Sequence, residues 1–392
     1  MMQNTDFNYI KNDGYAKLVA HGFDTMVEVY KTKIPFELKD KLTDKRNECA
    51  DRDTGKAEGL SLKFGGQEFQ INPYRAKGVE FIIKNEYFTI DFMYTEWNIK
   101  VTFHPPVLWE MGIIKAREFL LSFLLKEVRP DGDDWARVST VHYAFDFHAP
   151  AFDNEMQPTL LNSFVCVSGV KKRVMGKMDF DFWMNGARGE TLTLGTKKSL
   201  QLQIYNKTKE IKEFSGKYWM YDLWAQGGLV VDPNNPPTIW RVEIRFGKEH
   251  LKNRDKSDMR RFECLVPYIF ELCVHALECR RLTVPNYKDR NKSRWPMHPL
   301  WTAIFDACGN PPERVELGRL IEKTREEMNH MFKGNVRGDA RSWSVSQFGE
   351  YDRQKVQDFL IKEILDEIEN DPDHTMKIIR AQERYKLIDC GR

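Results

Sequence analysis

The stretch TVHYAFDFH, residues 140–148, alternates apolar and polar side chains. Successive residues of a strand point to opposite faces of a sheet, so a period of two residues is typical of a half-buried strand. One face would carry the apolar side chains of Val141, Tyr143, Phe145 and Phe147. The other face would carry His142, Ala144, Asp146 and His148. The stretch therefore predicts a strand whose solvent-facing side presents a carboxylate and imidazoles.

Two later stretches repeat this alternation, namely LQLQIYNK at residues 200–207 and WRVEIRF at residues 240–246. Their polar faces would carry Gln201, Gln203 and Tyr205 in the first stretch, and Arg241, Glu243 and Arg245 in the second. If the three strands share one sheet, a tyrosine, acids, imidazoles and arginines lie together on one exposed surface. Such a surface could hold a metal ion and break a phosphodiester bond.

The sequence around these stretches predicts an α+β fold. Five strand-like runs, separated by short polar or glycine breaks, occupy residues 60–64, 69–72, 79–84, 87–94 and 98–104. This spacing is typical of an antiparallel meander. A helical period follows, and beyond residue 255 helical patterns dominate. We therefore expect a flexible lead over residues 1–20, an antiparallel sheet domain flanked by helices over 21–255, and a mostly helical domain over 256–392.

Composition limits the class of protein. The chain has 392 residues with 60 Lys and Arg against 58 Asp and Glu, so its net charge is small. Residues 166–217 are locally basic, with 11 Lys and Arg against 5 Asp and Glu, which favours a polyanionic partner. The 7 cysteines are widely spaced and form no CxxC pair, as in a reduced cytoplasm. The polar start and the charged residues within 113–125 predict neither a signal peptide nor a membrane span, so we expect a cytoplasmic protein.

Tyr205 is the candidate nucleophile. A phenol with a pKa near ~10 needs neighbouring cations or a metal ion to attack a phosphate at neutral pH. Lys207 lies just beyond it, and Arg241 or Arg245 could neutralise the charge of the phosphate. The alternative is a surface tyrosine that only packs against its neighbours.

Asp146, Glu243, His148 and His142 are the candidate metal ligands. Asp146 and His148 lie two residues apart on one strand face, roughly 6–7 Å between Cα atoms, so both can reach one point. His142 needs a bulge to join them, or it has another role. Oxygen and nitrogen ligands together suit Mg²⁺ or Mn²⁺. The alternative is that Glu243 forms an ion pair with Arg241 or Arg245.

Basic clusters are candidate DNA contacts. They include Lys197, Lys198, Lys171, Lys172 and Arg173 near the candidate nucleophile, and Arg290, Lys292 and Arg294 in the stretch YKDRNKSRWP. That stretch also holds aromatic residues, and charge combined with stacking surface suits a nucleic acid. A solvated linker is the alternative. The chain contains no phosphate-binding loop of an ATP-driven motor and no His-x-His pair.

Three segments together resemble the replication initiation factor (Rep_trans) family of rolling-circle initiators and related relaxases. They are VSTVHYAFDFH at 138–148, GETLTLGTKKSLQLQIYNKTKEI at 189–211 and WRVEIRFGKEHL at 240–251. The resemblance covers roughly residues 60–255. It implies that Tyr205 is the nucleophile and that Asp146 and Glu243 bind the metal. The family usually has Arg-x-Asp where this chain reads Thr140-Val141-His142, so either a histidine would replace one acidic ligand or the metal would use His148.

The resemblance implies a metal-dependent DNA nicking-joining enzyme that starts rolling-circle replication through a 5′-phosphotyrosyl intermediate. Its DNA target would be single-stranded or an extruded hairpin. A host helicase, a polymerase and a second copy of the chain are candidate partners. The helical C-terminal region would bind the origin or a partner. The alternatives are a DNA-binding regulator without catalytic activity, a relaxase of a conjugative element, and a nuclease that cleaves by hydrolysis.

Overall fold

The computed structural model describes residues 14–50, 60–73, 76–166, 180–185, 188–252, 258–309, 325–371, 374, 375 and 378. The chain divides into two compact units. The first comprises Met1–Lys252 with Ser257–Val315, and the second comprises Asn253–Lys256 with Glu316–Arg392. We describe each unit by itself.

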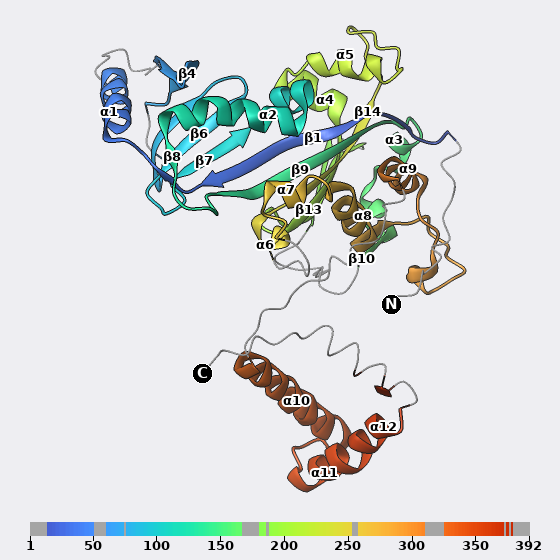
Figure 1. Cartoon of the computed structure of the whole chain (residues 1–392). Coiled ribbons are helices and arrows are strands. Elements are labelled where there is room, and N and C mark those ends of the chain that lie inside the picture. Colours follow the sequence, from blue (N-terminus) through green and yellow to red (C-terminus); the bar gives the residue numbers. More distant parts are fainter. Residues whose placement is uncertain are drawn as a thin grey trace. The chain divides into compact units, whose positions relative to one another are not determined.

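In the described part of the first unit, an antiparallel sheet of 11 strands forms the frame (Figure 1). In spatial order its strands are β11 (Phe180–Asn185), β12 (Arg188–Gly195), β13 (Leu200–Asn206), β14 (Ile239–Phe246), β9 (Ala136–His148), β1 (Lys17–Tyr30), β7 (Ile99–Phe103), β6 (Phe88–Met93), β5 (Val79–Lys84), β4 (Gln67–Ile71) and β3 (Ser61–Phe64). Two short pairs lie outside it, β2 (Thr32–Lys33) with β8 (Arg129–Pro130) and β10 (Phe164–Cys166) with β15 (Arg280–Leu282). The predicted α+β fold with an antiparallel sheet is confirmed.

The three stretches of the sequence analysis are neighbouring strands, in the order β13, β14, β9. Their register places Tyr205 opposite Arg241, and Arg241 opposite Asp146. Directly opposed residues of antiparallel strands point to the same face. The predicted sharing of one sheet face by Tyr205, Asp146 and Glu243 is therefore confirmed.

Helices cover both faces of the sheet. The longest helix of the first unit's described part is α2 (Pro105–Glu127), whose Phe119 and Phe123 pack against Phe88 of β6. A bend occurs inside it at Gly112, where φ is 75°. On the same face, α5 (Trp219–Gln226) packs against β1 and β9 (Figure 1). The other α-helices in the described part of the first unit are α1 (Phe36–Ala50), α3 (Phe152–Glu155), α4 (Lys207–Glu210), α6 (Lys248–Leu251), α7 (Phe262–Leu265), α8 (Ile269–Cys279) and α9 (Pro299–Cys308).

The first unit continues beyond the expected boundary at residue 255. Its apolar helix α8 packs on the opposite face of the sheet from α5, with the Phe270 ring against Tyr143 of β9. Beyond residue 255, where helical patterns dominate the sequence, α7 and α8 are separate helices, because Pro267 between them has no N–H to continue the first one. The first unit also starts earlier than expected, since β1 begins at Lys17, inside the expected lead.

The second unit is helical in its described part, as predicted. It contains α10 (Arg325–Phe348), α11 (Arg353–Asp358) and α12 (Leu365–Glu369), with a π-helical turn over Phe359–Ile364 that joins the last two. The Trp343 ring of α10 stacks on Phe359, with centroids 3.9 Å apart. Within the described part of the chain, no helix is long and apolar enough to cross a membrane.

Candidate active site

Tyr205 lies on β13 at the edge of a cavity of about 390 Å³. Its hydroxyl donates a hydrogen bond to Oε2 of Glu243, on the neighbouring strand β14, at 2.9 Å. The side chain is half-buried. The cavity is lined by Asp24, Thr25, Thr140, His142, Lys197, Tyr205, Lys207, Glu210, Lys217, Glu243 and Arg245. Cations, acids and a phenol therefore share one small polar space.

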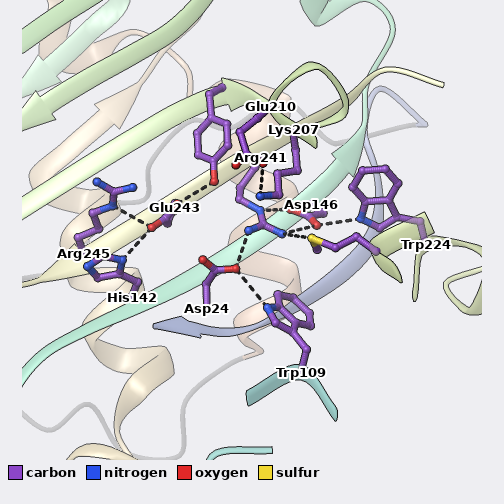
Figure 2. Close-up of polar contacts among 12 residues, drawn as sticks. Asp24, Trp109, His142, Asp146, Lys207, Glu210, Trp224, Arg241, Glu243 and Arg245 are labelled. Carbon is purple, nitrogen blue, oxygen red and sulfur yellow. Dashed lines mark hydrogen bonds and ion pairs between the residues drawn. The ribbon is translucent and has the colours of Figure 1, made fainter. Parts of the chain in front are cut away.

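Glu243 connects Tyr205 to two further groups. Its Oε1 accepts a hydrogen bond from Nε of Arg245 at 2.8 Å and lies 2.9 Å from Nδ1 of His142 (Figure 2). The strand register explains the contact, because Arg245 of β14 is directly opposite His142 of β9. Burial alone would raise the pKa of Glu243, but the hydrogen bond to His142 and the charge of Arg245 hold it well below its ordinary value. Glu243 is therefore an ionised carboxylate at neutral pH.

Tyr205, in contrast, resists ionisation. Burial raises its pKa well above the ordinary value for a tyrosine, and the adjacent Glu243 carboxylate raises it further. The hydroxyl thus keeps its proton and points it at a carboxylate that can accept it. Any reaction of this phenol as a nucleophile has to remove the proton during the attack.

Asp146 forms a buried ion pair with Arg241. Nε and Nη2 of Arg241 donate to Oδ1 and Oδ2 of Asp146 at 2.6 and 2.8 Å, and Nε1 of Trp224 donates to Oδ2 at 2.9 Å (Figure 2). Asp146 and Arg241 are both fully buried. The expectation of an exposed polar face is wrong here, because Trp224 and Met220 of α5 cover this part of the sheet. Arg241 is accordingly enclosed and does not line the cavity.

Asp24 is a site residue that sequence reasoning missed. Its Oδ1 accepts hydrogen bonds from Nη1 of Arg241 at 2.6 Å and from Nε1 of Trp109 at 3.2 Å. Figure 2 shows its second oxygen on the side of Glu243 and His142. Burial alone would raise the pKa of Asp24, but the Arg241 guanidinium holds it below its ordinary value. The residue lies at an irregularity of β1, where the register with β9 shifts between Phe23 and Thr25, so simple alternation does not place it.

Lys207 lies beside the phenol. Its Nζ is 5.8 Å from the centroid of the Tyr205 ring and donates to Oε2 of Glu210 at 2.5 Å. The side chain is buried, and burial lowers its pKa, with a further lowering by Arg241. Among the described residues, Lys197 and Lys217 form no ion pair, and both line the cavity. These cations could contact a bound phosphate.

The predicted metal ligands are not brought together as a set. Both oxygens of Asp146 are taken by Arg241 and Trp224. His148 is opposite Ile239 and Lys17 at the end of β9, and its buried Nδ1 has no hydrogen-bond partner among the residues that the structure describes. Only Glu243 and His142 of the predicted set are in contact. The described residues contain no group of three or more His, Cys, Asp or Glu placed to hold a metal ion, so the predicted ligand set does not fit.

The predicted DNA-contacting residues do not form one cluster in the described part of the chain. Lys197 lines the cavity, and Lys198 lies beside it in the turn between β12 and β13. Arg294 is paired with Asp289 by two hydrogen bonds of 2.8 Å, and Nζ of Lys292 donates to the carbonyl of Asn162 at 3.0 Å. Arg290 is exposed in the same segment. The predicted residues Lys171, Lys172 and Arg173 lie outside the described part of the chain.

Comparisons with known proteins give distant similarities. No protein-family profile matches the chain. The chain is 24% identical over 209 residues to the uncharacterized protein ORF430 of Pseudomonas phage Pf1. This match covers 48% of the chain and spans less than half, 46%, of that protein. A solved rolling circle replication initiator protein from Geobacillus stearothermophilus superposes with a TM-score of 0.40 at 16% identity, over 77% of this chain and 99% of that one. Neither similarity assigns the chain to a family.

Proposed function

We propose that the protein is a site-specific DNA nicking-joining enzyme that starts rolling-circle replication, with Tyr205 as its nucleophile. The observation that carries the proposal is the Tyr205 hydroxyl, which is hydrogen-bonded to the ionised Glu243 in a polar cavity that several lysines also line. The sequence segments that resemble rolling-circle initiators meet at this cavity. The proposed catalytic domain is the sheet domain, and the C-terminal helices are proposed to bind origin DNA or a partner.

The proposed reaction exchanges one ester for another. Oη of Tyr205 attacks the phosphorus, its proton passes to Oε2 of Glu243, and the bond from phosphorus to the 3′ oxygen breaks. The products are a 5′-phosphotyrosyl link and a 3′-hydroxyl, which takes its proton from solvent. A DNA 3′-hydroxyl reverses the step by attacking the phosphotyrosine. Since the ester bond is conserved, joining requires no ATP.

Glu243 is the proposed general base. It is ionised, within hydrogen-bond distance of the proton, and oriented by His142 and Arg245. Transfer during the attack overcomes the raised pKa of Tyr205, because a free phenolate never has to form in the buried site. Lys207 and Arg245 are proposed to stabilise the negative charge that develops on the phosphate.

The requirement for Mg²⁺ or Mn²⁺ remains a prediction. A divalent ion would supply charge neutralisation at a phosphate oxygen. Because the predicted ligand set is broken up by the Asp146–Arg241 pair, the steps above involve only groups of the chain. Nicking measured in EDTA and then with added Mn²⁺ tests the requirement.

The direct test is nicking of a supercoiled plasmid that carries the DNA flanking the gene for this chain. We expect the wild-type protein to nick it and Tyr205→Phe to bind it without nicking. Tyr94→Phe, which alters an exposed tyrosine outside the cavity, is the matched control and should nick normally.

The alternatives give different outcomes in the same assay. A DNA-binding regulator would never nick the plasmid. A hydrolytic nuclease would nick it without a protein-linked 5′ end. A relaxase of a conjugative element would share the chemistry and differ in its target, which would be a transfer origin. A host helicase, a polymerase and a second copy of the chain remain proposed partners.

A further inference from the structure

The connector Ile211–Tyr218, defined as the residues between α4 and α5, presents aromatic side chains to solvent. It begins with a π-helical turn over Ile211–Ser215 and reverses at Gly216, where φ is 63°. The ends are fixed because Ile211 and Met220 are fully buried in a cluster with Trp224. Between these anchors, Phe214 is 80% exposed and Tyr218 is 56% exposed.

The connector also contributes to the cavity of Tyr205. Lys217, the residue before Tyr218, lines that cavity together with Lys197 and Lys207. The amide of Tyr218 donates to the carbonyl of Gly216 at 2.8 Å, which tightens the backbone around Lys217. The Tyr218 ring makes an edge contact with Tyr221 of α5, with centroids 5.8 Å apart. An ammonium group directed at the cavity and an exposed ring therefore come from consecutive residues.

We propose that this connector is a base-stacking platform for single-stranded DNA, an inference that rests on the proposed function. The phosphate of the bound strand would enter the cavity, and a neighbouring base would stack on Tyr218, with Phe214 as a second stacking surface. Exposed aromatic rings next to cations are the features by which proteins bind single strands without reading sequence. Bases within a duplex are already stacked on each other, so the platform selects an unpaired strand. The lysines beside the rings favour a nucleic acid over an apolar protein partner.

The test measures binding of a fluorescent mixed-sequence 20-nucleotide single strand by anisotropy. All variants are made in the Tyr205→Phe background, so that covalent chemistry does not contribute. Tyr218→Ala and Phe214→Ala are compared with Tyr94→Ala and Phe36→Ala, whose side chains are 63% and 73% exposed. We expect Tyr218→Ala to weaken binding about tenfold, the order found for loss of one stacked base, and Phe214→Ala to weaken it less. Both controls should bind as the parent does, and Tyr218→Trp should restore affinity.

Two outcomes would overturn the platform. Equal single-strand affinity of Tyr218→Ala and Tyr94→Ala would show that the exposed ring has another partner, such as a protein. An equal loss of affinity for a blunt duplex would show that the ring does not select an unpaired strand. Neither outcome affects the nucleophile, because nicking by a chain with an intact Tyr205 is measured separately. Conversely, a covalent adduct that survives Tyr205→Phe would refute the proposed function and leave the stacking result standing.

Discussion

At the scale of single residues, the phenolic proton of Tyr205 points at an ionised carboxylate. Register explains this arrangement, since Gln203 is paired with Glu243 and Tyr205 with Arg241 on adjacent strands. The Tyr205 side chain therefore reaches diagonally to the carboxylate, which is 2.9 Å from its hydroxyl. Glu243 cannot move away easily, because His142 and Arg245 hold its other oxygen.

Glu243→Gln should slow formation of the DNA adduct by about 10²–10⁴-fold, the usual contribution of a general base. The amide keeps the shape of the side chain but cannot take the proton. The measurement is the single-turnover rate of adduct formation on a labelled oligonucleotide from the flanking DNA. Glu68→Gln, an exposed position on β4, is the control. If Glu243→Gln formed the adduct as fast as the wild type, Glu243 would not be the proton acceptor.

Arg241→Met should destabilise the protein by about 3–5 kcal/mol, because it leaves two buried carboxylates without their cation. Urea unfolding measures the loss. Arg294→Met is the matched control, since Arg294 forms an equally bidentate pair with Asp289 but is exposed, and it should change stability little. An equal loss of stability in the two variants would contradict the claim that burial of the Arg241 ion pairs makes Arg241→Met destabilising.

The loss of stability that Arg241→Met causes should depend on pH. The folded-state pKa of Asp24 lies below its ordinary value of 3.8, so its pairing stabilises the wild type above about that pH. The stabilisation is lost as pH falls through the folded-state pKa. Urea unfolding at pH 7 and at pH 3 should thus give a smaller difference between wild type and variant at the lower pH. An equal difference in stability at the two pH values would contradict the stabilising role of the ion pair between Asp24 and Arg241.

At the scale of elements, strand alternation predicted the sheet face on which each site residue lies, but not whether a helix covers that residue. A period of two residues identifies Tyr205, Arg241 and Asp146 as sharing a face. It cannot show that Trp224 of α5 closes over Asp146, since that depends on packing between distant segments. The irregularity in β1 likewise prevented strand alternation from placing Asp24 at the site. The expectation that the whole polar face is exposed was wrong, because the alternation of side chains along a strand carries no information about the helices that cover the sheet.

The turn between β12 and β13 holds Lys197 at the cavity through contacts with Gly247. The amide of Gly247 donates to the carbonyl of Ser199 at 2.6 Å, and an added Cβ would overlap the backbone of Lys197 and Lys198. Gly247→Ala should therefore displace the turn, lower stability by about 1–3 kcal/mol and weaken binding of single-stranded DNA. Thermal unfolding and anisotropy measure the two effects. Unchanged values for both would show that the turn accommodates the methyl group.

At the scale of the whole molecule, all lining residues of the cavity belong to the first unit. The helices α7, α8 and α9 belong to the same unit, so a cut near residue 255 would remove part of its core, such as Leu272 and Trp301. Sequence periodicity detected these helices but gave no information on which unit they pack against. Only contacts between distant segments decide that.

A chain ending at Val315 should therefore fold and form the DNA adduct, whereas a chain ending at residue 255 should not. Circular dichroism melting and adduct formation on a short single strand are the measurements. If the second unit binds the origin as proposed, the chain ending at Val315 should lose affinity for the origin duplex. Loss of adduct formation on the short strand would place a required group in the second unit.

The central claim is that Tyr205 becomes covalently joined to DNA. The measurement is mass spectrometry of proteolytic peptides after incubation with a single strand from the flanking DNA and nuclease trimming of the attached nucleotides. The account predicts a nucleotide adduct on the peptide that contains Tyr205, and no adduct in Tyr205→Phe. An adduct on Tyr218 or Tyr221, or cleaved DNA with no adduct on any peptide, would contradict it.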